Sequence, residues 1–516
     1  MPVLEVVLFL VLCAVALGWV ARRANVPYPI ALVIGGGALG FVPGLPQLQF
    51  DPQLLLVLVL PPILYQAALL TSWRDFKANA PKIGTLAIGL VIATTLLVGT
   101  ALKLMVPDIP WAVAFAFGAI VSPPDAVAAT AILSRMSIPR RIVTVLEGES
   151  LVNDASGLVL YKFAVAAALT GAFSLQAASL QFVAVAGGGV VVGLALGALF
   201  IAVHKCLGDA FIEVLLSLSI PYAAYILAES LHLSGVLAVV AAGVMRGRYT
   251  PEIVSAEMRI LARSVWNILV FLLNSLIFIL IGMALSGVAG RIQGISAAEL
   301  ATTSLVVTLA AVAVRLAWVY TLEYVPRWAG LGRGRPRVPG AELFLEGWCG
   351  MRGIVSLAAA LALPVAVEGG APFPYRDLVI LLTFVVIAVT LVVQGLTMPV
   401  LIRRLRLAKD ASAEDEHRLA SRVMGAAALE AIARLAPQEG ASPALLERLQ
   451  VEVAERMPAA GEGLVSEREA AVARRIRLAA IQAQRQALIR VWREGLVSDE
   501  VLHQLEEALD YEESRL

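Results

Sequence analysis

Long apolar blocks dominate this chain up to about residue 405, and most of them are about 18–25 residues long. A helix needs about 20 apolar residues to cross the hydrocarbon core of a bilayer, and soluble domains seldom carry several such blocks. Overall, 59% of the residues are apolar and 15% are charged. Leu, Val and Ala prevail at helical length, which favours helices over the short alternating strands of a transmembrane β-barrel. The sequence therefore predicts an all-α polytopic membrane protein.

Charge in the loops predicts the number of spans and their orientation. We count thirteen apolar segments, at roughly 3–20, 28–44, 53–70, 82–106, 111–134, 143–171, 180–204, 211–229, 233–246, 262–288, 297–325, 341–366 and 376–405. Loops after odd-numbered segments hold 21 Lys and Arg residues, and loops after even-numbered segments hold three. Because positive residues concentrate in cytoplasmic loops, we expect a multi-pass protein of the cell membrane with its N-terminus outside and its C-terminal tail in the cytoplasm. The first segment lacks a preceding basic region and a cleavage site, so we expect it to be retained as a span.

The chain changes character after Lys409. From Ala411 onward it carries 19 acidic residues, 13 arginines and no lysine. Residues 470–496 place apolar side chains at helical spacing, which predicts soluble amphipathic helices. We therefore expect a transmembrane domain at 1–409 and a small helical cytoplasmic tail at 410–516 that regulates rather than catalyses.

Polar groups gather inside the sixth segment. Within eight residues it carries Glu147, Glu149, Asn153 and Asp154, although a charge inside a membrane is costly and marks a functional site by default. Ser150 and Asp154 share one helix face, and Glu149 and Asn153 form the neighbouring pair. Carboxylate, hydroxyl and amide oxygens suit hard cations such as the alkali ions. Because burial penalises a bare charge, we expect Asp154 to hold either a proton or a cation, and Glu147 to lie nearer the cytoplasmic entrance.

Two segments are predicted to break within the bilayer. Pro123 and Pro124 remove backbone donors in the middle of the fifth segment, and Asp125 follows at the positive end of the restarting half-helix. The twelfth segment is interrupted by a glycine-rich stretch at 347–353, and its Arg352 would offset the negative ends of the broken helices. Interrupted backbone is tolerated at membrane depth only where protein buries it or where it lines a cavity.

The two interrupted segments are seven apart in a thirteen-segment chain. Interruptions at corresponding positions of two halves are typical of transporters with inverted repeats and a binding site near the midplane. We therefore predict two inverted six-helix repeats, segments 1–6 and 8–13, joined by segment 7, with the interrupted helices crossing at the ion site.

Five motifs, in order along the chain, resemble those of one transporter family. They are Pro-Pro-Ile-Leu-Tyr (61–65), Ser-Pro-Pro-Asp (122–125), Glu-Ser-Leu-Val-Asn-Asp (149–154), Phe-Leu-Leu-Asn-Ser-Leu-Ile-Phe (271–278) and Gly-Met-Arg-Gly (350–353). Together they resemble the sodium/proton exchanger family, cation:proton antiporter class 1, over about residues 5–405. The resemblance implies a homodimer in which a core domain moves against a dimerisation domain, and electroneutral exchange of a monovalent cation for a proton.

The resemblance also implies roles for individual residues. Asp154 would bind the proton and the cation in turn, while Glu149 and Ser150 would help to coordinate the alkali ion. Asn153 would stabilise the site, and the main-chain carbonyl of Pro124 would reach the ion. The neighbouring Asn153 cannot take up a second proton, which also favours electroneutral exchange.

The chain departs from the family pattern in two places. The family commonly has an acidic residue after the position of Tyr65, paired with the arginine of the twelfth segment, whereas this chain has Gln66. Arg352 therefore needs another partner, and Glu346 and Glu149 are the candidates. The other departure follows Pro123: some members have Thr-Asp-Pro where this chain has Pro-Asp-Ala, so no threonine side chain is available. The expected cation is Na⁺ or Li⁺, with K⁺/H⁺ antiport as the alternative.

Other function classes fit the sequence less well. A gated cation channel would need a filter loop rich in carbonyl groups, and the chain has no such loop. A membrane enzyme is disfavoured because the chain has four histidines and neither a His-Glu-X-X-His nor a Gly-X-Ser-X-Gly motif. Three scattered cysteines suggest neither a disulfide framework nor a metal cluster. We expect no cofactor, no nucleic-acid partner and no small organic substrate, only the transported ions and the lipid bilayer.

Overall fold

The structure is a computed structural model of the 516-residue chain. It describes residues 3–24, 26–42, 52–133, 136, 138–171, 175–253, 256–289, 296–328, 338–367, 371–405 and 423–434, with a few single positions beyond. The chain divides into two compact units, 1–409 and 410–516, which we describe separately.

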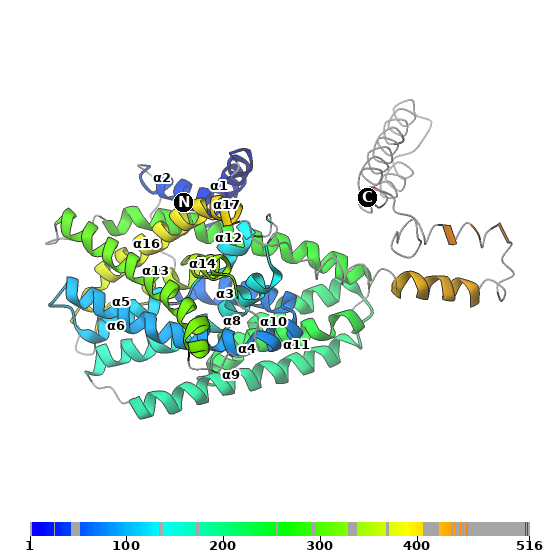
Figure 1. Cartoon of the computed structure of the whole chain (residues 1–516), viewed down its shortest axis with the longest axis horizontal. Helices are drawn as coiled ribbons and strands as arrows, with labels where there is room; N and C mark the ends of the chain where they lie inside the picture. The colour runs from blue at the N-terminus through cyan, green and yellow to red at the C-terminus, as the bar shows by residue number, and fades with distance from the viewer. Residues whose placement is uncertain are drawn as a thin grey trace. The chain divides into compact units, whose positions relative to one another are not determined.

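The first unit is built from helices, drawn in Figure 1. Its first half contains α1 (Val3–Arg23), α2 (Tyr28–Gly40), α3 (Pro52–Leu70), α4 (Trp73–Gly84), the π-helical η1 (Thr85–Leu90), α5 (Val91–Met105), α6 (Trp111–Val121), α7 (Ala126–Leu133) and α8 (Arg140–Thr170). Its second half contains α9 (Leu175–His204), α10 (Ala210–Ser230), α11 (Gly235–Ile253), α12 (Ala256–Ala289), α13 (Ala297–Trp328), α14 (Gly340–Trp348), α15 (Ile354–Leu361), α16 (Arg376–Val389), the π-helical η2 (Thr390–Gln394) and α17 (Gly395–Leu405). Among the described residues, β-pairing is limited to a single bridge between Ala366 and Pro372.

Many of these helices are apolar enough to lie in a bilayer. Seven continuous runs in the described part of the chain have the length and composition to cross one: 73–105, 140–170, 179–204, 210–230, 258–283, 297–327 and 376–405. Three shorter apolar helices occur at 28–40, 57–70 and 111–121. All ten fall on segments expected from the sequence, so the all-helical membrane class is confirmed, whereas the full count of thirteen crossings stays a prediction.

Both expected breaks are present. The fifth segment stops at the end of α6, Val121, and restarts with α7 at Ala126, because the intervening prolines supply no N–H for a continuing helix. The twelfth stops at Trp348 and restarts at Ile354 across the glycine-rich stretch. The backbone N–H of Asp125 donates to the carbonyl of Met351 at 2.7 Å, so the two interrupted regions lie against each other.

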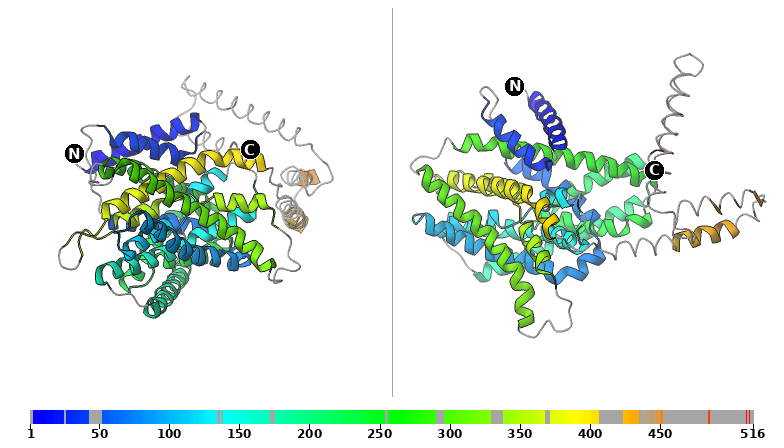
Figure 2. Two further views of the ribbon diagram at one scale, coloured as in Figure 1. Left: turned by 60° about the vertical axis from the view of Figure 1, so that its left-hand side comes forward. Right: turned by 45° about the horizontal axis from the view of Figure 1, so that its top comes forward.

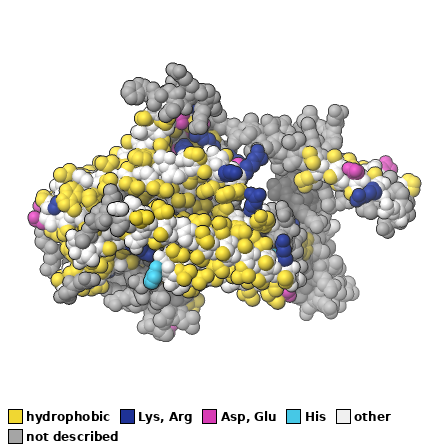
Figure 3. All heavy atoms as spheres, turned by 90° about the horizontal axis from the view of Figure 1, so that it is seen from below, with side chains coloured by type: hydrophobic (Ala, Val, Ile, Leu, Met, Phe, Trp, Pro, Cys, Tyr) yellow, Lys and Arg dark blue, Asp and Glu magenta, His cyan; other side chains and the backbone are white. Residues whose placement is uncertain are grey.

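Glycines permit close approach between helices on the two edges of this unit. A Cβ at Gly36 would collide with the carbonyl of Ile279, which fixes α2 against α12. A Cβ at Gly193 would collide with the carbonyl of Ala238, so α9 lies against α11 in the same way. Figures 1 and 2 show α1 and α2 along one edge of the bundle and α9 along the opposite edge. The face nearest α9 is covered mainly by hydrophobic side chains, and its Lys and Arg gather toward one end (Figure 3).

The second unit is described only in part. Residues 423–434 form a helix. The amphipathic stretch expected at 470–496 lies, save for one position, outside the described residues, and the regulatory role of the tail stays a prediction.

Candidate functional site

The centre of the site is the crossing of the two interrupted helix pairs, α6–α7 and α14–α15. Asp125 immediately precedes α7, and a Cβ on Gly353, the residue before α15, would overlap the Asp125 carboxylate. The carboxylate therefore lies at the N-terminal ends of two half-helices at once, where unpaired N–H groups and the helix dipole favour a negative charge. Gly353 is required here because any side chain would displace that carboxylate.

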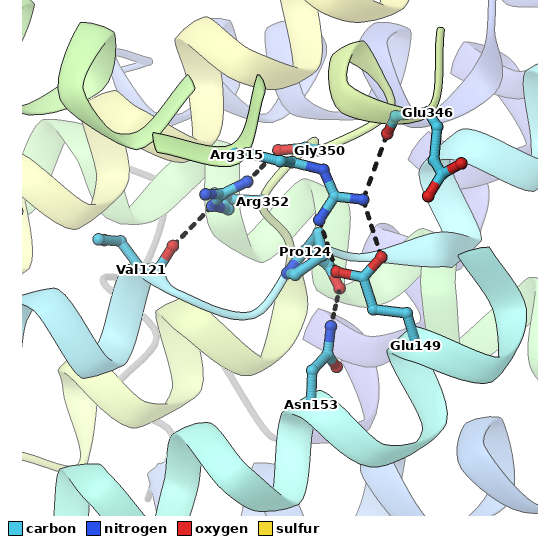
Figure 4. A network of polar contacts seen from close by, with 8 residues as sticks. All are labelled: Val121, Pro124, Glu149, Asn153, Arg315, Glu346, Gly350 and Arg352. Atoms are coloured by element: carbon cyan, nitrogen blue, oxygen red, sulfur yellow. Dashed lines mark hydrogen bonds and ion pairs between the residues drawn. The ribbon is translucent and has the colours of Figure 1, made fainter. Parts of the chain in front are cut away.

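Arg352 occupies the opposite, negative end of the crossing. Its side chain is 1% exposed, and its Nε donates to the carbonyl of Val121, the last residue of α6, at 2.6 Å. Its Nη1 donates to the carbonyl of Gly350, and its backbone N–H donates to the Thr390 hydroxyl at 3.1 Å, within the π-helical turn η2. Figure 4 shows the guanidinium between these carbonyls. The arginine thus supplies hydrogen bonds to carbonyl groups that have no partner within a helix.

Asp154 projects from the middle of α8 toward the crossing. It is 6% exposed and lines a cavity of about 580 Å³ together with Ser150, Pro124 and Asp125. We call this the site cavity; Glu147 lines it as well. The structure thus brings together three predicted ligand groups, the carboxylate of Asp154, the hydroxyl-bearing Ser150 and the main chain at Pro124. The i, i+4 spacing of Ser150 and Asp154 is the reason that both reach it.

Asn153 fastens α8 to the broken segment. Its side chain is fully buried, and its Nδ2 donates to the carbonyl of Pro124 at 3.4 Å (Figure 4). The contact holds in place the same carbonyl group that was expected to face the ion. Its position therefore fits the stabilising role that the sequence suggested.

Glu149 lies apart from Asp154. Both of its carboxylate oxygens accept hydrogen bonds from Arg315 of α13, at 2.5 and 2.8 Å, and both side chains are 1% exposed. Glu149 is not among the described residues that line the site cavity. Five residues along a helix correspond to about 140° of rotation, so Glu149 and Asp154 face different neighbours. In this structure a bidentate ion pair with Arg315 occupies the carboxylate for which a direct cation contact was expected.

Among the described contacts, neither candidate partner forms an ion pair with Arg352. Glu149 forms an ion pair with Arg315, and Oε2 of Glu346 accepts a hydrogen bond from Nζ of Lys82 at 2.5 Å. Sequence reasoning missed both cations as partners. The sequence did contain a signal for these ion pairs, because isolated opposite charges inside apolar segments are expected to pair. Residue spacing could not show which carboxylate would pair with which cation.

Gln66, which replaces the common acidic residue, makes a neutral contact. Its Nε2 donates to Oδ1 of Asn267 at 3.1 Å, which joins α3 to α12. Both residues line the site cavity. The wall of the cavity at this point therefore adds no charge beside Asp154.

Comparison with known proteins decides the family. The family described as "Sodium/hydrogen exchanger, transmembrane" matches residues 7–404. This chain belongs to the sodium/hydrogen exchanger family. Its members are cation/proton antiporters, so the chain belongs with transporters rather than enzymes, and the resemblance inferred from the motifs is confirmed.

Relatives of this exchanger come from several bacteria. An uncharacterized Na⁺/H⁺ exchanger of Mycobacterium tuberculosis is 36% identical over 99% of this chain and 96% of its own length. A sodium, potassium, lithium and rubidium/H⁺ antiporter of Bacillus pumilus is 36% identical over 73% of this chain and 58% of its own length. Among solved structures, the sodium proton antiporter MjNhaP1 of Methanocaldococcus jannaschii covers 78% of this chain and 98% of its own, with a TM-score of 0.62 and 18% identity. That likeness shows a shared fold.

A second cavity lies farther along α8 of this exchanger. It measures about 380 Å³ and is lined by Ala155, Lys162 and Glu229, among others. Lys162 of α8 and Glu229 of α10 form an ion pair at 3.5 Å. Ala155 follows Asp154 directly, so α8 presents one face to the site cavity and an adjacent face to this second cavity.

Proposed function

We propose that this exchanger is an electroneutral antiporter of a monovalent cation, Na⁺ or Li⁺, and H⁺, in which Asp154 binds the two ions in competition. The observation that carries the proposal is the position of Asp154. It is a nearly buried carboxylate that opens on the site cavity beside Ser150 and the Pro124 main chain, at the crossing of two broken helices. One carboxylate in apolar surroundings is stable when a proton or a cation neutralises it.

The charges around the crossing support one charge per cycle. The buried ion pair of Arg315 with Glu149 and the partly buried pair of Lys82 with Glu346 are each neutral. Asp125 and Arg352 carry opposite charges and sit at opposite helix ends. Of the carboxylates at the crossing, Asp154 is then the one left for a proton or one monovalent cation to neutralise, and its neighbour Asn153 does not ionise. Glu147, which also lines the site cavity, lies toward the cytoplasmic entrance in this proposal. The return of a proton for each cation released leaves no net charge moved.

Alternating access needs the site to open to one side at a time. Asp154 lines the site cavity, while Ala155 and the Lys162–Glu229 ion pair line the second cavity. Leu151 and Ala155 of α8 pack into one buried apolar cluster with Leu60 of α3. We infer a conformation open through the site cavity, with α8 moving against α3, α10 and α11 to reach the other.

The remaining features of the proposal come from the sequence and the family. They are thirteen spans in two inverted repeats, a homodimer in the cell membrane, an outside N-terminus and a cytoplasmic regulatory tail at 410–516. Glu149 acts by holding Arg315, a positioning role, rather than by touching the cation.

K⁺/H⁺ antiport is the second candidate. The relative from Bacillus pumilus is named for potassium and rubidium as well as sodium and lithium. Proton flux driven in turn by Na⁺, Li⁺ and K⁺ in the same vesicles, compared at equal concentration, decides between the candidates.

Asp154→Asn in proteoliposomes tests the proposal. We expect cation-driven proton movement to be lost while the protein still folds and assembles; near-normal exchange would refute the role of Asp154. In the wild type, competition predicts a bell-shaped pH dependence, since protons fill the site at low pH and are too scarce for the return step at high pH. Vesicles clamped at opposite potentials with valinomycin and K⁺ should show equal Na⁺-driven rates. A rate that follows potential would exclude electroneutral exchange, and conduction without a counter-ion would indicate a channel.

A further inference from the structure

We propose that Asn274 of α12 and Ser356 of α15 supply neutral oxygen ligands to the cation while it occupies the site cavity, and that they set the preference among alkali cations. The inference rests on the proposed function, because it concerns the same cavity and the same ion. Both residues line that cavity. Both side chains are buried, since Asn274 is 2% exposed and Ser356 is 1% exposed.

Neither residue has found a protein partner for its side-chain oxygen. In the part of the chain that the structure describes, Oδ1 of Asn274 and Oγ of Ser356 are buried and make no hydrogen bond. Buried polar atoms are nearly always bonded to protein, water or an ion, because leaving them unpaired is costly. Since the described neighbouring helices provide no partner, the site cavity is the place from which one can come.

The lack of a partner does not single out these two residues by itself. The hydroxyl groups of Ser275, Thr94 and Thr383 are also buried without a hydrogen bond to the described residues. These three residues do not line the site cavity, whereas Asn274 and Ser356 do. The combination of an unpaired neutral oxygen with a place on the cavity wall is therefore what marks the two positions.

Asn274 lies on the side of α12 that borders the cavity. Asn267, Val270 and Asn274 all line it, and their spacing of three and four residues places them on one face of the helix. Oδ1 of Asn267 accepts a hydrogen bond from Gln66 at 3.1 Å. Asn274 lies two turns farther along, about 10 Å by the rise of a helix. Ser356 reaches the same cavity from the first turn of α15.

Amide and hydroxyl oxygens suit an alkali cation that has given up water. A cation that enters protein exchanges its hydration shell for protein oxygens, and the number and strength of those oxygens decide which cation is preferred. Asp154, Ser150 and the Pro124 main chain provide part of this shell in the proposed function. Asn274 and Ser356 add oxygens without adding charge, so the one-for-one stoichiometry proposed for Asp154 is unchanged.

Binding is tested first, separately from transport. The full-length protein in nanodiscs is titrated calorimetrically with NaCl, LiCl and KCl in turn, with choline chloride keeping the ionic strength constant. The variants are Asn274→Leu, which keeps a similar volume, and Ser356→Ala. The control is Ser275→Ala, which removes an unpaired buried hydroxyl away from the cavity. Each variant should lose about three- to tenfold in Na⁺ affinity and change the affinity order of the three cations, whereas the control should match the wild type.

Stability without cations separates a ligand from a structural residue. Replacing an unpaired buried polar group by an apolar one leaves stability unchanged or raises it. Ser356→Ala, unfolded by SDS in cation-free choline buffer, should therefore be at least as stable as the wild type while it binds Na⁺ more weakly. A variant that is less stable than the wild type, yet binds the three cations with unchanged affinities, would show that Ser356 is structural and would overturn its role as a ligand.

Na⁺-driven proton flux tests the same residues in transport. Each variant should raise the KM for Na⁺ in proportion to its loss of affinity and keep the maximal rate within about twofold, less than the change that one hydrogen bond makes. A wild type that exchanges ions with a cation order that neither variant alters overturns the inference and leaves the antiport proposal standing. A wild type that binds Na⁺ through these residues and exchanges no ions refutes the antiport proposal instead.

Discussion

Variants of the buried pair Glu149–Arg315 test whether Glu149 is a structural carboxylate or a cation ligand. Both side chains are 1% exposed and joined by bonds of 2.5 and 2.8 Å. Arg315→Met leaves a buried carboxylate without its partner, which costs about 3–5 kcal/mol of unfolding free energy. Glu149→Gln likewise leaves the buried Arg315 guanidinium without its carboxylate partner. The double variant removes both charges and should lose less than either single variant, because no uncompensated charge remains.

The assay is a double-mutant cycle. Unfolding free energies in mixed micelles are measured by SDS titration with tryptophan fluorescence, and we expect a coupling energy of about 3 kcal/mol between the two positions. Additive effects, or single variants that each cost less than about 1 kcal/mol, would refute the view that the two charges depend on each other.

Transport by the same double variant decides the role of Glu149. If Glu149 only holds Arg315, Arg315→Met/Glu149→Gln should fold, exchange ions and keep its KM for Na⁺ within about threefold, less than the tenfold that corresponds to 1.4 kcal/mol. If Glu149 touches the cation, the double variant should fold yet lose exchange. Ser150→Ala is the matched control, because Ser150 lines the site cavity. It should raise the KM with little effect on stability.

Three further changes test other parts of the site. Gly353→Ala places a methyl group where the Asp125 carboxylate lies and should abolish exchange. The control Gly340→Ala, whose Cβ meets no atom within 4 Å, should retain exchange. Activity in both variants would show that the crossing is adaptable. Lys162→Met removes the partly exposed ion pair with Glu229, so the free energy of unfolding should change by less than about 1 kcal/mol. The maximal exchange rate should change. An unaltered rate would show that the pair does not restrain α8. Removal of residues 410–516 should preserve exchange and shift its pH profile; complete loss in a folded truncation would make the tail part of the transport machinery.

Local chemistry predicted much of the fold. The prolines before Asp125 and the glycines around Arg352 are enough to predict two broken segments, because each removes a donor or a side chain that a continuing helix needs. The i, i+4 spacing likewise predicted that Ser150 and Asp154 share a face. These inferences depend on residues close in sequence, and the structure confirms them.

Partners between helices could not be predicted in the same way. Arg315 is 166 residues from Glu149, and Lys82 is 264 residues from Glu346. The sequence shows that each charge needs a partner, but the choice depends on how helices are rotated and offset when they pack. The helical phase did contain one usable warning, since five residues separate Glu149 from Asp154 and such residues do not share a face.

The replacement of an acidic residue by Gln66 is understandable once the contacts of Arg352 are known. The arginine donates to the carbonyl of Val121, at the C-terminal end of α6, and to that of Gly350. A helix C-terminus carries about half a negative charge, and further carbonyl groups surround the guanidinium, so backbone groups supply the compensation that a carboxylate would otherwise give. An acidic side chain at position 66 would instead add a negative charge to the site cavity, which Gln66 lines with Asp154. The glutamine, bonded to Asn267, adds no carboxylate of its own to the site cavity, which is what the proposed one-for-one exchange at Asp154 requires.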